Sequence, residues 1–470
     1  MGSIAPSAED YTPTFKTPWI ETPLVESAAL SRAAGCRIFL KLENVQPSGS
    51  FKSRAMGNQI LSHLRKPEYA NRRVHFYASS GGNAGLAAVC AARSLGYPCT
   101  VVVPLSTKPL MIEKLKAAGA ADVIRHGETF FEAGSYMKDV IMQTSSGDDN
   151  DVAKIALHPF DNQPIWEGNS TIIDELEKQL PAAANSEEEQ VYRGRALPLD
   201  AVLCSVGGGG LLNGLIMGLE KRRSQKQNGF SGSSATGHAY MDICPSETPS
   251  SRTVDGQPSL IHLLAIETDG TDSLATSIAH NALVSLPKIT SQATSLGAIR
   301  VSETTFQYAV APPPGIKVHS AVLTDAEAAR GVLRLADDER LLVELACGVC
   351  IEAAIGDTAT AAAETSASAH AVPGGQSPKK RGELNDSDLT RDEGYGDDRS
   401  SSADNETDHE NEPQVGDQTK SASPVLNSKL KQLIPDLNEQ SRVVIVVCGG
   451  SNVTIDMASE YRRLLSEGWV

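Results

Sequence analysis

The stretch Pro47-Ser48-Gly49-Ser50-Phe51-Lys52-Ser53-Arg54 decides how the rest of this chain is interpreted. Lys52 follows a turn rich in serine and glycine, and it opens a predicted helix. A lysine so placed can form an imine with an aldehyde cofactor when burial or nearby charge lowers its pKa. Taken alone, Lys52 is better explained as one of 42 lysines and arginines on a solvated face. Two further glycine-rich turns favour the chemical interpretation.

The first of these turns is a run of four glycines, Gly207, Gly208, Gly209 and Gly210. It follows a predicted strand at 201–206 and precedes a predicted helix that starts at Leu211. Four glycines let the backbone turn sharply and point several N–H groups at one anion, and the helix N-terminus adds positive potential. A Walker lysine and a G-x-G-x-x-G pattern with its downstream carboxylate are both missing. The run therefore predicts a phosphate-binding turn rather than a nucleotide site.

The second turn is Ser79-Ser80-Gly81-Gly82-Asn83-Ala84-Gly85, which also joins a predicted strand to a predicted helix. The Asn83 amide can both donate and accept a hydrogen bond, which suits a phenolic oxygen on a cofactor ring. Ser80 and the backbone N–H groups of the loop suit a carboxylate. A simple helix cap by Ser or Asn is the alternative, but a cap does not need so many glycines.

A third turn, Cys448-Gly449-Gly450-Ser451-Asn452, ends the last predicted strand. The Cys448 thiol can face a pyridine nitrogen as a weak, neutral partner. Alternatively, Cys448 is a small buried hydrophobic residue, which is the common fate of a free cysteine. The residues alone leave both interpretations open.

Apolar strands alternate with helices along the chain, which predicts an α/β fold with mostly parallel sheets covered on both faces. Two tracts interrupt the alternation and are predicted to be flexible insertions, because neither can bury enough apolar area. They are residues 222–258, rich in Ser, Gly and Gln, and residues 358–423, which end in an acidic run. We expect strands at 38–42, 74–78, 100–104, 122–125, 201–206, 263–267 and 443–448, and helices at 86–92 and 109–118.

Composition excludes several classes of protein. No apolar run reaches the roughly 18 residues of a membrane span, and no secretory signal is seen at the N-terminus. Thirteen of the acidic residues lie in 383–417, so the net charge of −16 belongs largely to one segment and nucleic acid is not expected as a partner. The eight cysteines lie mostly in apolar segments, which predicts a reduced, cytoplasmic protein. Cys347 and Cys350 form a lone C-x-x-C, too few ligands for zinc.

Together the turns at Ser50–Lys52, Ser80–Gly85, Gly207–Gly210 and Cys448–Asn452 resemble the fold type II family of pyridoxal-phosphate enzymes. The likeness is strongest to the serine dehydratase (L-serine/L-threonine ammonia-lyase) branch, and it runs over about residues 17–465, excepting the insertions. It implies a tryptophan synthase β-like fold of two open twisted, mostly parallel sheets flanked by helices. The implied small domain spans 53–154, and the large domain takes 1–52 and 155–470.

The resemblance also implies a role for each matching residue. Lys52 would carry pyridoxal 5'-phosphate covalently and move the substrate α-proton. Phe51 would pack on the ring, Asn83 would bond the ring hydroxyl, and Cys448 would face the ring nitrogen. The phosphate would lie against Gly207, Gly208, Gly209, Gly210 and Leu211, and the substrate carboxylate against Ser80, Gly81, Gly82, Asn83 and Ala84. A monovalent cation, with K+ as the candidate, would bind Glu267, Thr271, Leu296 and Ala298; the alternative for Glu267 is an ordinary strand-end carboxylate.

The implied reaction is the β-elimination of L-serine to pyruvate and ammonia, with L-threonine as a second substrate, in a cytoplasmic homodimer that feeds gluconeogenesis. Two rivals stay open: a β-replacement enzyme of the cysteine synthase type, and a cofactor-binding protein with little turnover. The β-replacement enzymes usually carry a hydroxyl residue where Cys448 stands. The chain departs from the family at Gly81, where close relatives often have a small side chain, and at Ser295, which replaces a common alanine.

Overall fold

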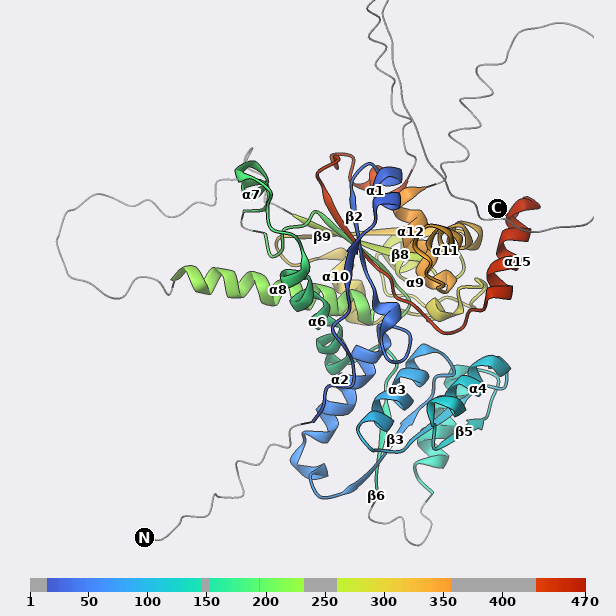
Figure 1. The fold of residues 1–470 in the computed structure, drawn as a ribbon. Coiled ribbons are helices and arrows are strands. Elements are labelled where there is room, and N and C mark those ends of the chain that lie inside the picture. Colours follow the sequence, from blue (N-terminus) through green and yellow to red (C-terminus); the bar gives the residue numbers. More distant parts are fainter. Residues whose placement is uncertain (1–14, 145–151, 194, 232–259, 357–427) are drawn as a thin grey trace, which may run out of the picture. The chain divides into compact units, whose positions relative to one another are not determined.

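The computed structural model describes residues 15–144, 152–193, 195–231, 260–356 and 428–470 (Figure 1). The described chain holds a six-stranded sheet and a four-stranded sheet, both flanked by helices. This confirms the predicted α/β class with two mostly parallel sheets. Most of the predicted insertions lie outside the described residues, although the helix after the tetraglycine turn continues through Ser231, so the first insertion begins within a helix.

The larger sheet has the strand order β1-β2-β10-β7-β8-β9. Only β1 runs antiparallel to its neighbour, and every other pairing in the sheet is parallel. The central strands are apolar on both faces because helices cover both sides. Their bounds are β1 Leu24–Glu26, β2 Arg37–Lys41, β7 Ala201–Ser205, β8 Ile261–Thr268, β9 Ile316–Leu323 and β10 Arg442–Val446.

The smaller sheet is parallel throughout and has the order β5-β4-β3-β6. Its bounds are β3 Arg73–Ala78, β4 Cys99–Val103, β5 Asp122–Arg125 and β6 Val152–Leu157. All seven expected strands are confirmed, whereas β1, β6 and β9 were not expected. The four strands of this sheet fall within 73–157, while the predicted domain limits of 53–154 stay a prediction.

Helices pack on both faces of the larger sheet, with α11 and α12 on one side and α6 and α8 on the other (Figure 1). Beside the smaller sheet, α2 contacts α3, and α2 also contacts α6, so it joins the two layers. The helices are α1 Ala28–Ala34, α2 Lys52–Leu64, α3 Asn83–Ser94, α4 Pro109–Ala118, α5 Phe130–Tyr136, α6 Gln163–Gln179, α7 Ser186–Tyr192, α8 Gly210–Ser231, α9 Ser273–Ala279, α10 Glu303–Val310, α11 Asp325–Glu339, α12 Leu345–Ile355, α14 Lys429–Leu433 and α15 Ile455–Ser466.

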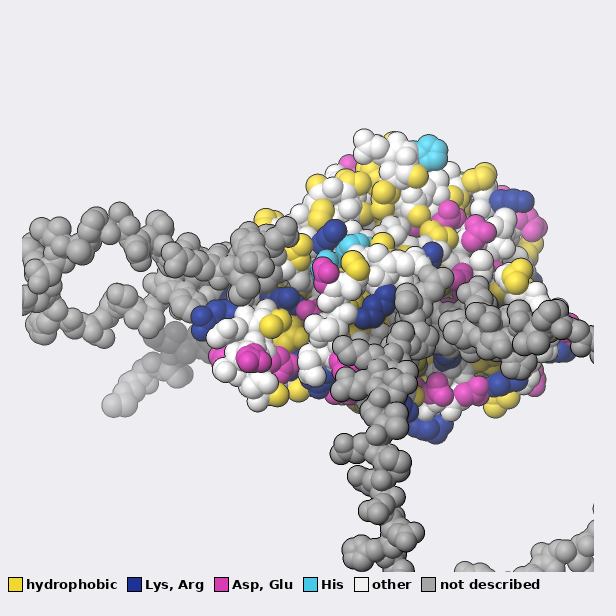
Figure 2. All heavy atoms as spheres, turned by 90° about the horizontal axis from the view of Figure 1, so that it is seen from above, with side chains coloured by type: hydrophobic (Ala, Val, Ile, Leu, Met, Phe, Trp, Pro, Cys, Tyr) yellow, Lys and Arg dark blue, Asp and Glu magenta, His cyan; other side chains and the backbone are white. Residues whose placement is uncertain are grey.

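Three further features concern the described residues. No helix among the described residues is long and apolar enough to cross a membrane. Cys347 and Cys350 lie in the buried core of α12, and all cysteines of the described ranges are free. On the face drawn in Figure 2, lysines and arginines are scattered among acidic side chains, which gives no continuous basic track there.

Candidate active site

Lys52 is the first residue of α2, directly after the turn that the sequence singled out. Its Nζ donates to the carbonyl of Pro159 at 3.0 Å and lies 5.1 Å from the centre of the Phe51 ring. Burial lowers the pKa of the Lys52 amine from 10.5 to about 8, and the nearby Cys448 opposes this shift. The neutral, nucleophilic fraction of the amine near neutral pH is therefore far larger than that of an ordinary lysine.

The turn before Lys52 is joined to the turn after β10, about 400 residues later in the chain. Ser50 and Gly449 form an isolated β-bridge, the Phe51 N–H donates to Cys448 O at 3.2 Å, and the Gly450 N–H donates to Gly49 O at 2.9 Å. Gly449 has a φ of +81°, and a Cβ there would lie 2.3 Å from Gly49 O. Only glycine fits this approach, so the double glycine after Cys448 brings that thiol next to the lysine.

Cys448 is 5% exposed and lies beside Ser205 at the end of β7, with Sγ and Oγ 3.3 Å apart. Burial raises the pKa of the Cys448 thiol. The side chain is thus a neutral thiol at the carboxyl ends of two adjacent parallel strands, where ligands of open α/β sheets bind. Its predicted contact with a ring nitrogen stays a prediction.

The tetraglycine turn links β7 to α8, as expected, and Gly209 adopts a φ of +91°. A Cβ at Gly208 would lie 2.2 Å from the Phe160 ring, and one at Gly210 would lie 2.5 Å from Phe160 O. A Cβ at Gly209 would lie 1.9 Å from Thr305 Oγ1. The chain therefore needs glycine at these positions to form the turn, and Leu211 is buried just behind it.

Pro159 and Phe160 connect this turn to Lys52, and sequence reasoning missed them. They follow β6 and precede α6; Pro159 accepts from Lys52, and Phe160 contacts two of the glycines. The available signal was His158-Pro159-Phe160 directly after the apolar run Ile155-Ala156-Leu157, at a strand end where sites form. The Pro159–Phe160 segment therefore lies against both Lys52 and the tetraglycine turn.

The loop from Ser80 to Ala84 joins β3 to α3, whose N-cap is Gly82. No side chain caps the first turn of α3, so the N–H groups of this turn are available to an anion. The Gly82 N–H donates to Ser80 Oγ at 3.3 Å. A Cβ at Gly81 would lie 2.7 Å from the Thr107 side chain, which gives a physical reason for glycine at this departure from the family.

Asn83 has several partners within the protein. Its Oδ1 accepts from the Ser451 N–H at 2.9 Å, and its Nδ2 donates to Glu344 Oε1 at 3.0 Å and to Ser295 Oγ at 3.3 Å. Sequence reasoning missed Glu344, whose only signal was a lone acid before the apolar run of α12. The structure thus brings Asn83 and the Cys448–Asn452 turn together, while the bond from Asn83 to a ring hydroxyl stays a prediction.

Of the residues predicted to hold a cation, Glu267, Thr271 and Leu296 are buried and Ala298 is half-buried. Both carboxylate oxygens of Glu267 accept backbone N–H groups, from Leu274 and Ala275, each at 2.8 Å. Burial raises the pKa of Glu267 to about 8. Leu296 lies against Gly207 and accepts from the Ala298 N–H at 2.7 Å, whereas Thr271 bonds to Thr268. Glu267 thus caps α9, and the cation site stays a prediction.

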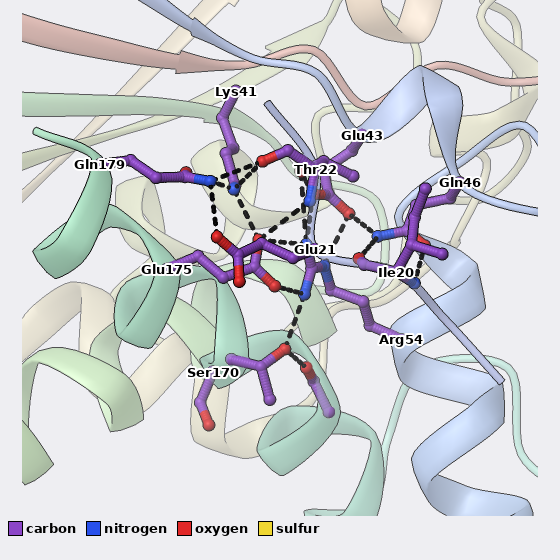
Figure 3. A network of polar contacts seen from close by, with 12 residues as sticks. Ile20, Glu21, Thr22, Lys41, Glu43, Gln46, Arg54, Ser170, Glu175 and Gln179 are labelled. Atoms are coloured by element: carbon purple, nitrogen blue, oxygen red, sulfur yellow. Dashed lines mark hydrogen bonds and ion pairs between the residues drawn. The ribbon is translucent and has the colours of Figure 1, made fainter. Parts of the chain in front are cut away.

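A buried charge network supports the start of α2 (Figure 3). Arg54, two residues after Lys52, is completely buried and forms bidentate ion pairs with Glu43 and Glu175. Lys41 also pairs with Glu175, with Nζ and Oε2 2.5 Å apart. Burial would raise the pKa of Glu175, but Arg54 and Lys41 outweigh it and lower that pKa. The network ties α2 to β2 and α6, and so holds Lys52 in place.

Comparisons with known proteins agree with this geometry. The family model described as pyridoxal-phosphate dependent enzyme matches residues 16–372. The chain is 36% identical over 319 residues to a catabolic L-serine/threonine dehydratase of Saccharomyces cerevisiae, covering 68% of this chain and 75% of that protein. It is 34% identical over 328 residues to an L-serine dehydratase/L-threonine deaminase of Mus musculus, covering 70% of this chain and 80% of that protein.

Among solved structures, a fungal L-serine ammonia-lyase from Rhizomucor miehei is similar to the chain with a TM-score of 0.62 and 23% identity. The match covers 95% of this chain and 99% of that one. A maize serine racemase is similar with a TM-score of 0.57 and 18% identity, over 96% of this chain and 94% of that one. At these identities the likeness concerns the fold.

Proposed function

Because this chain belongs to the family of pyridoxal-phosphate dependent enzymes, with serine and threonine dehydratases among its relatives, we propose that it is an L-serine ammonia-lyase. The net reaction converts L-serine to pyruvate and ammonia, and L-threonine to 2-oxobutanoate as a second activity. One observation carries the proposal. The Lys52 amine, with a pKa of about 8, contacts the Pro159–Phe160 segment that packs against the tetraglycine turn, and the turn before Lys52 is joined to the turn that carries the neutral Cys448 thiol.

The residues of the site fit pyridoxal phosphate. The tetraglycine turn packs so closely on Phe160 and Thr305 that a Cβ at Gly208 or Gly209 would clash, and it lies at the N-terminus of the long helix α8. Such a turn is suited to the phosphate group, since backbone N–H groups and the helix end favour an anion. Lys52 would bind the aldehyde carbon covalently. The neutral thiol of Cys448 would face the ring nitrogen without protonating it.

Each residue of the site then has its own role in the reaction. The bound cofactor supplies an electron-withdrawing ring that makes the substrate α-hydrogen acidic. The uncapped first turn of α3 orients the substrate carboxylate. Lys52, as a neutral amine, removes the α-proton and carries it as an ammonium group. A neutral thiol at Cys448 keeps the ring nitrogen unprotonated, which favours loss of the β-hydroxyl over transamination.

The proposal is tested by coupled pyruvate detection with the purified protein and L-serine. We expect pyruvate release by the wild type, its loss in Lys52→Ala together with the visible absorbance of the bound cofactor, and no change in Lys66→Ala, which removes an exposed lysine beyond the same helix. Pyruvate release by Lys52→Ala at the wild-type rate would refute the assigned role.

Two further assays separate the rivals. Consumption of sulfide with O-acetylserine, without pyruvate from serine, would identify a β-replacement enzyme. Cofactor absorbance without turnover of any of these substrates would identify a binding protein.

We further propose that the enzyme is a dimer activated by a monovalent cation. Sedimentation would test the dimer, and a comparison of activity in K+ and Li+ salts would test the cation.

A further inference from the structure

We propose that Glu344 is a positioning residue that fixes the Asn83 amide so that an Asn83 N–H, and not its oxygen, faces the ring oxygen of the cofactor. The inference rests on the cofactor site proposed above. It concerns how that site is held, and it does not depend on which amino acid is the substrate.

The Glu344 carboxylate is unusual for a buried charge. Glu344 is 6% exposed and has no lysine or arginine partner within the described part of the chain. Glu352, on the same helix α12, is 1% exposed and pairs with Arg330 and Arg334. Burying an unpaired carboxylate is costly, so its surroundings must compensate it with hydrogen bonds.

Three neutral donors provide that compensation. Glu344 Oε1 accepts from Asn83 Nδ2 at 3.0 Å and from the Asn452 N–H at 2.7 Å, and Oε2 accepts from the Ser295 hydroxyl. These donors come from α3, from the turn after β10 and from the 294–296 segment. One carboxylate therefore connects the substrate loop to the turn that adjoins Lys52.

Gly450 makes room for this arrangement. It has a φ of +114°, and a Cβ at this position would lie 2.3 Å from the Glu344 carboxyl carbon. Any side chain at Gly450 would displace the carboxylate, so the second glycine of the turn serves the contact between Glu344 and Asn83.

The partners of Asn83 leave one orientation for its amide. A backbone N–H can only donate, so Ser451 requires the Asn83 oxygen, and the acceptor Glu344 requires the Asn83 nitrogen. One amide hydrogen is thus held by Glu344. The other makes the longer contact with Ser295, at 3.3 Å, and is the one available to a ligand. A donor at that point stabilises the ring oxygen of the cofactor in its unprotonated form.

The experiment compares Glu344→Ala, Glu344→Gln and the control Glu352→Ala, each reconstituted with pyridoxal phosphate. We measure the Kd of the cofactor, the visible spectrum of the holoenzyme and the thermal midpoint. Glu344→Ala should raise the Kd roughly tenfold, the lower end of what loss of a ligand-orienting partner causes. Its spectrum should shift toward the form with a protonated ring oxygen, because the Asn83 amide then loses one of the two contacts that fix its orientation and keeps only the Ser451 N–H.

Glu344→Gln should retain the wild-type Kd and spectrum, since its amide oxygen still accepts from Asn83 and Asn452 and its NH2 group meets Ser295. Glu352→Ala should lower the thermal midpoint and leave both cofactor readouts unchanged. A wild-type Kd and spectrum in Glu344→Ala would overturn the proposal. So would a Glu344→Gln protein as perturbed as the alanine variant, because charge rather than orientation would then be responsible.

If Glu344→Ala does not fold, Glu344→Asp takes its place, since the shorter side chain also loses the Asn83 contact. The same shift is expected, and wild-type values would again overturn the inference. If the variants show the expected changes in Kd and spectrum but the wild type releases no pyruvate from serine, the proposed function is refuted and the role of Glu344 stands.

Discussion

Replacing Arg54 by methionine removes the central cation of the buried network around α2. Arg54 is fully buried and pairs with Glu43 and Glu175, while Lys41 stays with Glu175. Two carboxylates would then share one lysine, and one negative charge would remain buried without compensation. Breaking a buried ion pair from one side costs about 3–5 kcal/mol. We expect a loss of this size in the free energy of unfolding of Arg54→Met.

Urea unfolding followed by circular dichroism measures this loss. Arg462→Met is the matched control, because Arg462 and Asp337 form a pair that is more than half exposed on both sides, which contributes less than about 1 kcal/mol. Adding Glu43→Gln to Arg54→Met should restore part of the stability, since the charges then balance again. A loss in Arg54→Met no larger than that of the control would refute the reasoning that the network holds α2 in place.

Three further outcomes are expected. Covalent attachment of pyridoxal phosphate to the apoprotein should accelerate as the pH rises through about 8, because only the neutral Lys52 amine attacks; stopped-flow absorbance that rises only near 10.5 would contradict this. Gly209→Ala should abolish cofactor binding in a fluorescence titration, since its Cβ would lie 1.9 Å from Thr305 Oγ1, whereas Gly96→Ala, at a φ of +83° with open space around it, should bind normally. Burial lowers the pKa of His319 from 6.5 to about 4. Between these two pH values the unfolded chain binds more protons than the folded one, so the free energy of unfolding should fall as the pH drops from 6.5 to about 4. His319→Gln should flatten this loss in urea unfolding, and an unchanged pH profile would contradict the assignment.

The local sequence was enough to predict the class of the fold and most of its strands. Central parallel strands are apolar on both faces, so runs such as Val443–Val446 are recognisable without their neighbours. The strands β6 and β9 were missed because they mix polar residues into the run, as in Val152-Ala153-Lys154 and Lys317-Val318-His319. Their pairing with β3 and β8 decides their conformation, and that pairing is a tertiary contact.

The glycine-rich turns were also predictable, because a sharp turn between a strand and a helix restricts the residue types within a few positions. What each turn contacts was not predictable. Pro159, Phe160 and Glu344 are ordinary residues locally, and they matter only because the sheet order places them beside Lys52, the tetraglycine turn and Asn83.

The sequence by itself thus determined which backbone turns form and which side chain is the candidate nucleophile, since both follow from short-range sterics and intrinsic chemistry. The tertiary structure decided that burial lowers the pKa of Lys52, that burial raises the pKa of the Cys448 thiol and that a carboxylate contacts Asn83. The physical reason is that desolvation and hydrogen bonding depend on which distant segments surround a group, and neighbours along the chain do not specify them.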